Sequence, residues 1–306
     1  SEDTMNPTIN KSISIIGVAM DLGAGTPGVS LGPEAIRYAG IEKRLTSIGY
    51  DLKDLGDIRA VRPVNAITEG TNLKNLDEVA RINTLLCEKV DSVLKEGRFP
   101  LVLGGDHSIA IGTIFGVLQH KKNLGVIWFD AHGDINTDMT SPSGNIHGMP
   151  VSVLLGIGHP KLTSIGGESQ LKAKNIVFIG ARDLDSGERK LLKELGITVF
   201  TMHEIDRYGM PYVIEKAIEI ASNGTDGIHV SFDVDCMDPV HAVGTGTRVA
   251  GGMTYRESHF ALEMINQSNK LVSAEFVEVN PLIDVQNQTA KEAVALIGSL
   301  MGEWLI

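Results

Sequence analysis

Acidic and imidazole side chains recur in four short segments of the sequence, and side chains of these types bind metal ions. His107 lies in the motif GGDHS at 104–108, and the motif DAHGD occupies 130–134. The motif DVDCMDP occupies 233–239, and Glu278 lies in the segment FVEVNP. Each segment ends or directly follows a short apolar run, so all four are expected at the ends of strands.

The spacing inside two of these motifs predicts that their side chains converge. Residues two apart in an extended chain face the same way, about 6–7 Å per step. Four carboxylates gathered with two imidazoles would repel one another unless cations neutralised them. Six ligands suit two divalent ions better than one, and the mixture fits Mn²⁺ without excluding Zn²⁺, Co²⁺ or Fe²⁺. The predicted ligands are His107, Asp130, His132, Asp134, Asp233 and Asp235.

The competing interpretation is that each motif is only a turn. Any single DxHxD or DxD match can be a loop of capping residues, whereas four matches at four strand ends favour a metal site. Asp106 and Asp238 are different, because Asp106 adjoins a predicted ligand and Asp238 precedes Pro239. For these two aspartates a turn or a supporting role is expected.

The elements that position these motifs alternate along the chain. Continuous apolar runs predict strands at 12–20, 51–55, 100–105, 124–130, 175–181, 198–202, 227–235 and 271–279. Amphipathic stretches predict helices at 33–47, 76–96, 109–120, 186–194, 205–222, 255–266 and 290–301. This pattern predicts a single three-layer α/β domain over residues 1–306, with an eight-stranded parallel sheet flanked by helices and a loose tail at 1–10. The motifs then lie at the carboxyl ends of strands, where open α/β sheets bind ligands.

Composition narrows the function classes. The 306 residues include 27 Lys and Arg against 38 Asp and Glu, a net charge of −11, which argues against nucleic-acid partners and a polybasic membrane anchor. The 42% hydrophobic content excludes intrinsic disorder. Two cysteines, no secretory signal at the start and no apolar membrane span predict a cytoplasmic protein. The long stretches 59–74 and 134–147 are candidate functional loops.

Two glycine motifs near the start do not carry the function. Residues 23–28 fit GxGxxG, but Pro27 and Pro33 delay the next helix past the third glycine, which a dinucleotide site does not allow. Residues 28–32 fit GxSxG, but the serine lies about ten residues beyond the strand, so the strand–elbow–helix context of a hydrolase nucleophile is missing.

The metal-site motifs resemble those of the arginase (ureohydrolase) family. GGDHS, DAHGD and SFDVDCMDP carry the resemblance, which covers nearly the whole chain from Gly28 to Pro281. It implies an arginase-like fold with an eight-stranded parallel sheet, two Mn²⁺ per chain and the six ligands named above. It also implies a homo-oligomer, a trimer or a hexamer.

Within the family, DAHGDINT at 130–137 and SPSGNIHG at 141–148 look like an arginase, which hydrolyses the guanidinium of L-arginine to L-ornithine and urea. A hydroxide shared by the two metal ions would be the nucleophile. The resemblance places Asn136 and Ser143, with Asn145, at the substrate α-carboxylate, and Asp185 and Glu188 around its α-amino group. It makes His147 the proton shuttle, helped by Asp134, assigns Glu278 to the guanidinium, and places Thr247 in the site.

Alternatives stay open. Agmatinase or another guanidino hydrolase would share the metal site but lack an α-carboxylate pocket, which Asn136, Ser143 and Asn145 argue against. The full ligand set disfavours a non-catalytic binding protein. Asp185 and Glu188 could instead cap the following helix, and His147 could be a helix-start residue without a catalytic role. The loop at 242–249 departs from the usual family form, in which proline is common near Val243 and at Arg248.

Overall fold

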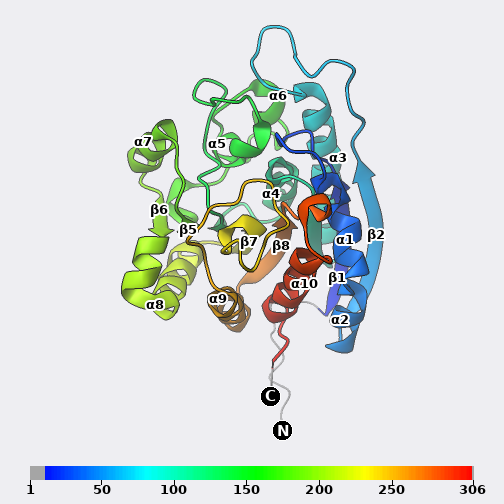
Figure 1. Cartoon of the computed structure of the whole chain (residues 1–306), viewed down its shortest axis with the longest axis vertical. Helices are drawn as coiled ribbons and strands as arrows, with labels where there is room; N and C mark the ends of the chain where they lie inside the picture. Colours follow the sequence, from blue (N-terminus) through cyan, green and yellow to red (C-terminus); the bar gives the residue numbers. More distant parts are fainter. Residues whose placement is uncertain (1–10, 305–306) are drawn as a thin grey trace.

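The sheet has all eight predicted strands. The computed structural model describes residues 11–304, so the predicted loose tail at 1–10 lies outside the described residues. The strands are parallel and follow the order β2-β1-β3-β8-β7-β4-β5-β6 (Figure 1). Their bounds are β1 Ser12–Ala19, β2 Asp51–Arg59, β3 Phe99–Gly104, β4 Leu124–Phe129, β5 Ile176–Ala181, β6 Thr198–Thr201, β7 Gly227–Asp233 and β8 Leu271–Val277.

Helices cover both faces of the sheet, which gives the predicted three layers. In β4, Ile127 and Phe129 pack into one apolar core, while Val126 and Trp128 pack into the other. The first core is covered by α1 Gly32–Tyr38, α2 Ile41–Ser47, α8 Met202–Ser222, α9 Tyr255–Gln267 and α10 Gln288–Leu300. The second is covered by α3 Leu76–Lys95, α4 Ala110–Leu118, α5 Pro150–Leu154, α6 Pro160–Thr163 and α7 Ser186–Leu195. No helix in the described range 11–304 combines the length and the apolar character needed to cross a membrane.

Several predicted bounds were wrong for local reasons. The single helix expected at 33–47 is two helices, because Gly40 between them has a left-handed backbone with φ 94°. The strand expected at 51–55 continues to Arg59, since an exposed edge strand shows no apolar pattern. Helix α8 begins three residues earlier than predicted, where Thr201 and Glu204 form a capping box. The short helices α5 and α6 were not predicted.

The strand order explains why distant segments form one site. β3, β8, β7 and β4 are neighbours at the centre of the sheet, and each is followed by one of the four motifs. β3 and β4 are consecutive in the chain, yet β8 and β7 lie between them. Since all the strands run the same way, the four motifs meet at one edge, as predicted.

Candidate metal centre and substrate cleft

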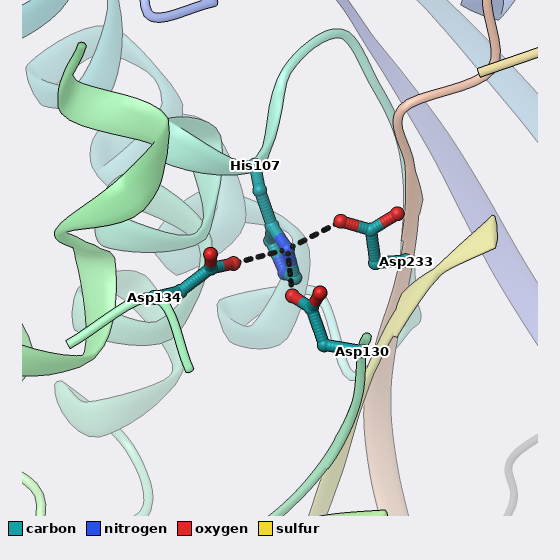
Figure 2. A group of neighbouring side chains, drawn as sticks. All are labelled: His107, Asp130, Asp134 and Asp233. Carbon is teal, nitrogen blue, oxygen red and sulfur yellow. Dashed lines mark hydrogen bonds and ion pairs between the residues drawn. The ribbon is translucent and has the colours of Figure 1, made fainter. Parts of the chain in front are cut away.

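The first cluster consists of His107, Asp130, Asp134 and Asp233 (Figure 2). The Nδ1 atom of His107 lies 3.1 Å from Asp130 Oδ2, 2.9 Å from Asp134 Oδ2 and 3.2 Å from Asp233 Oδ2. All four side chains are buried, and Asp130 is 0% exposed. Three carboxylate oxygens and one imidazole nitrogen thus point at a common centre.

The second cluster consists of Asp130, His132 and Asp235. The Nδ1 atom of His132 lies 3.0 Å from Asp235 Oδ2 and 3.4 Å from Asp130 Oδ1. Asp130 therefore contributes one oxygen to each cluster. In both clusters the potential ligand atoms lie within 4.8 Å of one another, close enough to hold a metal ion. The structure brings all six predicted ligands together as two adjacent groups that share one carboxylate.

The local backbone that divides the ligands differs from the predicted extended chain. Strand β4 ends at Phe129, and Asp134 has a left-handed backbone with φ 46°, so Asp134 faces the first cluster while His132 faces the second. Asp235 lies in a 3₁₀ turn rather than in β7. The six side chains do converge, but the predicted reason, an extended chain through each motif, was wrong, because the chain turns at each strand end. Strained backbone of this kind is common at functional sites.

The motif GGDHS places His107 by a close approach of two strands. A Cβ atom at Gly105 would lie 2.5 Å from the Met20 carbonyl oxygen, so only glycine fits there. Asp106 accepts hydrogen bonds from the backbone N–H of Gly23 and of Ser108, both at 2.9 Å, and caps the turn that begins at His107. The turn role predicted for Asp106 is confirmed. Asp238 also has its predicted role, since its carboxylate accepts three backbone N–H groups.

Two supporting side chains were missed from the sequence. The ring of Trp128 stacks on His107 with centroids 4.1 Å apart, and its Nε1–H donates to Asp130 Oδ2 at 3.0 Å. Ser231 Oγ lies 2.7 Å from His107 Nε2. Each lies on a strand, two residues before a predicted ligand: Trp128 before Asp130, which directly follows β4, and Ser231 before Asp233, which ends β7. The two-residue period of a strand could therefore have found them.

The electrostatics of the clusters favour a bound cation. Burial and then the charge of Asp130 raise the pKa of Asp134 well above its ordinary value. Burial and then the charge of Asp235 do the same for Asp233. Asp134 Oδ2 is buried, and beyond its 2.9 Å approach to His107 Nδ1 it has no hydrogen-bond partner among residues 11–304. Three buried carboxylates that crowd one imidazole nitrogen, beside a second imidazole, fit divalent metal ions.

A cleft of about 570 Å³ opens above the clusters. Its lining includes every predicted site residue except Asp130 and Glu278, which lie behind that surface. Three further lining residues were not predicted as site residues: Ser141, Pro142 and Gly148. The predicted loop 134–147 forms part of the wall, whereas 59–74, the long loop at the top of Figure 1, contributes none of the lining.

Glu278 and His147 form a pair at the inner end of the cleft. Glu278 is 2% exposed, and its Oε1 accepts the backbone N–H of His107 at 2.7 Å. The same oxygen lies 3.1 Å from His147 Nδ1. Burial is the largest single influence and opposes protonation of His147, but the charge and hydrogen bond of Glu278, together with the charges of Asp106 and Asp134, outweigh it and raise the pKa of His147 to about 9. The pair places a carboxylate and a protonated imidazole beside the first cluster.

The residues expected at the substrate α-carboxylate and at its α-amino group are in contact with each other. Asn136 Nδ2 donates to Asp185 Oδ2 at 2.8 Å. Ser143 and Asn145 also line the cleft. Thr247, another lining residue, donates from Oγ1 to Asp235 Oδ2 at 3.1 Å. The wall therefore presents neutral amide and hydroxyl groups together with one carboxylate.

Glu188 is the exception, because the backbone already uses both of its oxygens. They accept the N–H groups of Asp185 and Ile135, each at 3.1 Å, and Glu188 is 3% exposed. The first contact completes the capping box of α7. The arrangement favours the capping alternative, in which Glu188 supports Asp185 and the 130–137 loop instead of contacting a substrate.

Replacing Glu188 with alanine is expected to lower the free energy of unfolding by about 2 kcal/mol, through a lost cap and an unsatisfied buried N–H. Glu257→Ala is the matched control, since Glu257 caps α9 in the same way far from the cleft. The measurement is urea unfolding of both variants together with the KM for arginine of Glu188→Gln. A tenfold rise in KM at unchanged stability would instead assign Glu188 to direct substrate contact.

The loop at 242–249 compensates for its missing prolines. Arg248 is exposed, and its Nε–H donates to the Thr245 carbonyl oxygen at 3.2 Å within the same loop. The N–H of Thr245 in turn donates to the Val243 carbonyl at 3.0 Å. These local hydrogen bonds fix the backbone where proline rings would otherwise restrict it.

Comparison with known proteins agrees with this geometry. The model of the arginase family matches residues 11–302. Arginase of Brevibacillus brevis is 56% identical over 299 residues, which are 97% of this chain and 100% of the relative. The native structure of Bacillus caldovelox arginase matches with a TM-score of 0.94 and 56% identity, over 97% of this chain and 100% of that one. Entamoeba histolytica arginase, solved in complex with L-ornithine, matches with a TM-score of 0.86 and 36% identity, over 96% and 99% of the two chains. The chain therefore belongs to the arginase family.

Proposed function

We propose that the protein is an arginase, which hydrolyses the guanidinium group of L-arginine to L-ornithine and urea with two divalent metal ions, Mn²⁺ by preference. The observation that carries the proposal is the pair of carboxylate and imidazole clusters that share Asp130 at the base of a polar cleft. The high identity to arginases over nearly the whole chain supports the same activity.

The metal ligands in this proposal are His107, Asp130, Asp134 and Asp233 for one ion, and Asp130, His132 and Asp235 for the other. When bound, two such ions lower the pKa of water and supply a strong nucleophile at neutral pH. A planar cationic guanidinium is a poor electrophile and needs one. The cleft is also lined by carboxylates, so its field attracts a cationic substrate.

Three residues orient the substrate and move protons. Glu278 binds the guanidinium through a charge-assisted hydrogen bond and so fixes its plane. Asp134 accepts the proton of the attacking nucleophile after the addition step. His147 is held beside Glu278 with a pKa raised to about 9, so it is protonated at neutral pH and donates a proton to the leaving amine of ornithine.

The wall residues recognise the amino-acid end of the substrate. Asn136, Ser143 and Asn145 donate hydrogen bonds to the α-carboxylate, and Asp185 accepts from the α-ammonium group. Thr247 lines the cleft and supports Asp235 through its hydrogen bond. Glu188 holds Asp185 and the loop in place.

The choice between arginine and agmatine tests this proposal most sharply. Agmatine lacks the α-carboxylate, so the amide and hydroxyl donors of the wall would stay unpaired when it binds. We expect kcat/KM for arginine to exceed that for agmatine by at least about 100-fold. Urea release from both substrates, measured beside the metal content, is the experiment. A preference for agmatine would establish the alternative guanidino hydrolase, and a metal-loaded protein that hydrolyses neither would establish a binding protein.

The compartment and the assembly belong to the same proposal. Both cysteines, Cys87 and Cys236, are free and buried, which suits a reducing compartment such as the cytoplasm. A homo-oligomer, a trimer or a hexamer, is what the family resemblance implies.

A further inference from the structure

Arg182 follows strand β5, and its guanidinium is bound entirely by backbone carbonyl groups. Nη2 donates to the carbonyl oxygens of Asp235 at 2.8 Å, Met237 at 3.2 Å and Val249 at 2.7 Å. Nη1 donates to those of Cys236 at 3.0 Å and Gly180 at 3.1 Å, and Nε donates to Val249 at 3.1 Å.

None of these contacts is an ion pair, and within residues 11–304 no carboxylate comes within salt-bridge distance of the Arg182 guanidinium. The side chain is partly buried, and Gly252 packs closely against it, because a Cβ atom at Gly252 would lie 2.5 Å from Nη2. A planar group with five N–H donors in a fixed fork can satisfy several carbonyl oxygens at once, whereas lysine offers one compact ammonium group. Arginine is therefore specifically suited to this position.

Most of these contacts are made to segments that carry or support the second cluster. The Asp235 and Cys236 carbonyls belong to the 3₁₀ turn that carries the Asp235 side chain. Val249 lies two residues beyond Thr247, whose hydroxyl donates to the Asp235 carboxylate. One guanidinium thus ties the turn of a predicted ligand to the loop that supports the same ligand.

The backbone of Arg182 completes the arrangement on the other side of the cluster. The N–H groups of Arg182 and Asp183 both donate to the Ala131 carbonyl, at 2.9 and 3.0 Å. Ala131 lies between Asp130 and His132, and its own N–H donates to Asp235 Oδ1 at 3.1 Å. Arg182 therefore contacts the backbone next to each of the three ligands of the second cluster. Of the first cluster, no hydrogen bond of Arg182 reaches His107 or Asp233, and the two clusters share only Asp130.

We propose that Arg182 is a positioning residue that fixes the spacing of Asp130, His132 and Asp235, and so sets the affinity of the second metal cluster. The inference rests on the proposed function in one respect, that this cluster binds a metal ion. It predicts a selective effect on one of two metal equivalents. A purely structural arginine would lower stability and leave both affinities unchanged.

The experiment compares Arg182→Lys and Arg182→Gln with Arg98→Lys. Arg98 is a matched control, since its guanidinium also binds backbone carbonyls, those of Ile13 and Asp51, but at the start of β3 and the opposite edge of the sheet. The metal-free proteins are titrated with Mn²⁺, free and bound metal are measured at each step, and EPR reports spin coupling between paired ions. Thermal unfolding of each metal-free protein gives the stability.

For the Arg182 variants we expect one equivalent to bind about 10- to 100-fold more weakly, as for other residues that orient metal ligands. The other equivalent should weaken much less, since its cluster shares only Asp130 with the second, and the EPR signal of coupled ions should be lost at intermediate metal concentration. Arg98→Lys should lose stability and keep both affinities. Wild-type affinities for both equivalents in the Arg182 variants would overturn the proposal, as would failure of both to fold, which would assign Arg182 a general folding role. A wild-type protein that binds fewer than two equivalents would instead contradict the proposed function itself.

Discussion

Replacing Asp130 with alanine is expected to remove both metal ions and to lower arginine turnover by at least about 1000-fold, because metal activation supplies several kcal/mol of the barrier reduction. Asp130 contributes Oδ2 to the first cluster and Oδ1 to the second, so its loss leaves each cluster short of a ligand. It also leaves the buried His107 without one of its three acidic neighbours.

Asp235→Ala supplies the sharpest contrast, since Asp235 belongs to the second cluster alone. We expect this variant to keep one equivalent and still lose activity. Asp226→Ala is the control at the other end of β7, where Asp226 accepts only the backbone N–H of Asn123. The measurement is bound metal per chain after dialysis, with urea release in parallel. Two full equivalents in Asp130→Ala would show that Asp130 is not a shared ligand.

The sequence was sufficient to predict which segments meet, because the carboxyl ends of parallel strands share one edge of the sheet. Apolar runs such as those of β4 and β5 are long enough to be identified without any structure. The sequence was not sufficient, however, to predict which ligand belongs to which cluster. That division depends on the left-handed backbone at Asp134 and on the 3₁₀ turn at Asp235.

The supporting residues were harder to predict for a different reason. Arg182 binds backbone carbonyl groups, which every residue carries, so the side-chain pattern of the sequence cannot predict its partners. Glu188 was predicted from the family resemblance as a substrate residue, with helix capping as the alternative. Only the positions of the two N–H groups that it accepts could favour capping. The predicted range of edge strand β2 was too short, because an exposed strand lacks the apolar pattern on which strand prediction depends.

Glu278→Gln is expected to keep both metal equivalents and to lower kcat by about 1000-fold. Glutamine retains an oxygen that can accept the His107 N–H, the contact that Glu278 Oε1 makes at 2.7 Å, so the first cluster should keep its shape. It loses the negative charge that would bind and orient a guanidinium, an interaction of several kcal/mol in a buried site. It also removes the charge that raises the pKa of His147 to about 9, so the imidazole should titrate at lower pH in an NMR experiment.

Glu275→Gln is the matched control, because Glu275 is a buried carboxylate on the same strand and also pairs with a histidine, His229, at 3.0 Å. Glu275 lies within β8, and its carboxylate pairs with His229, whereas Glu278 contacts His107 and His147 beside the first cluster. We therefore expect this variant to lose stability and to keep kcat within about threefold of the wild type. If both variants lost kcat equally, the effect would come from disturbing strand β8 rather than from the guanidinium contact. If Glu278→Gln lost a metal equivalent, its carboxylate would serve the first cluster and the assignment to the substrate would be wrong.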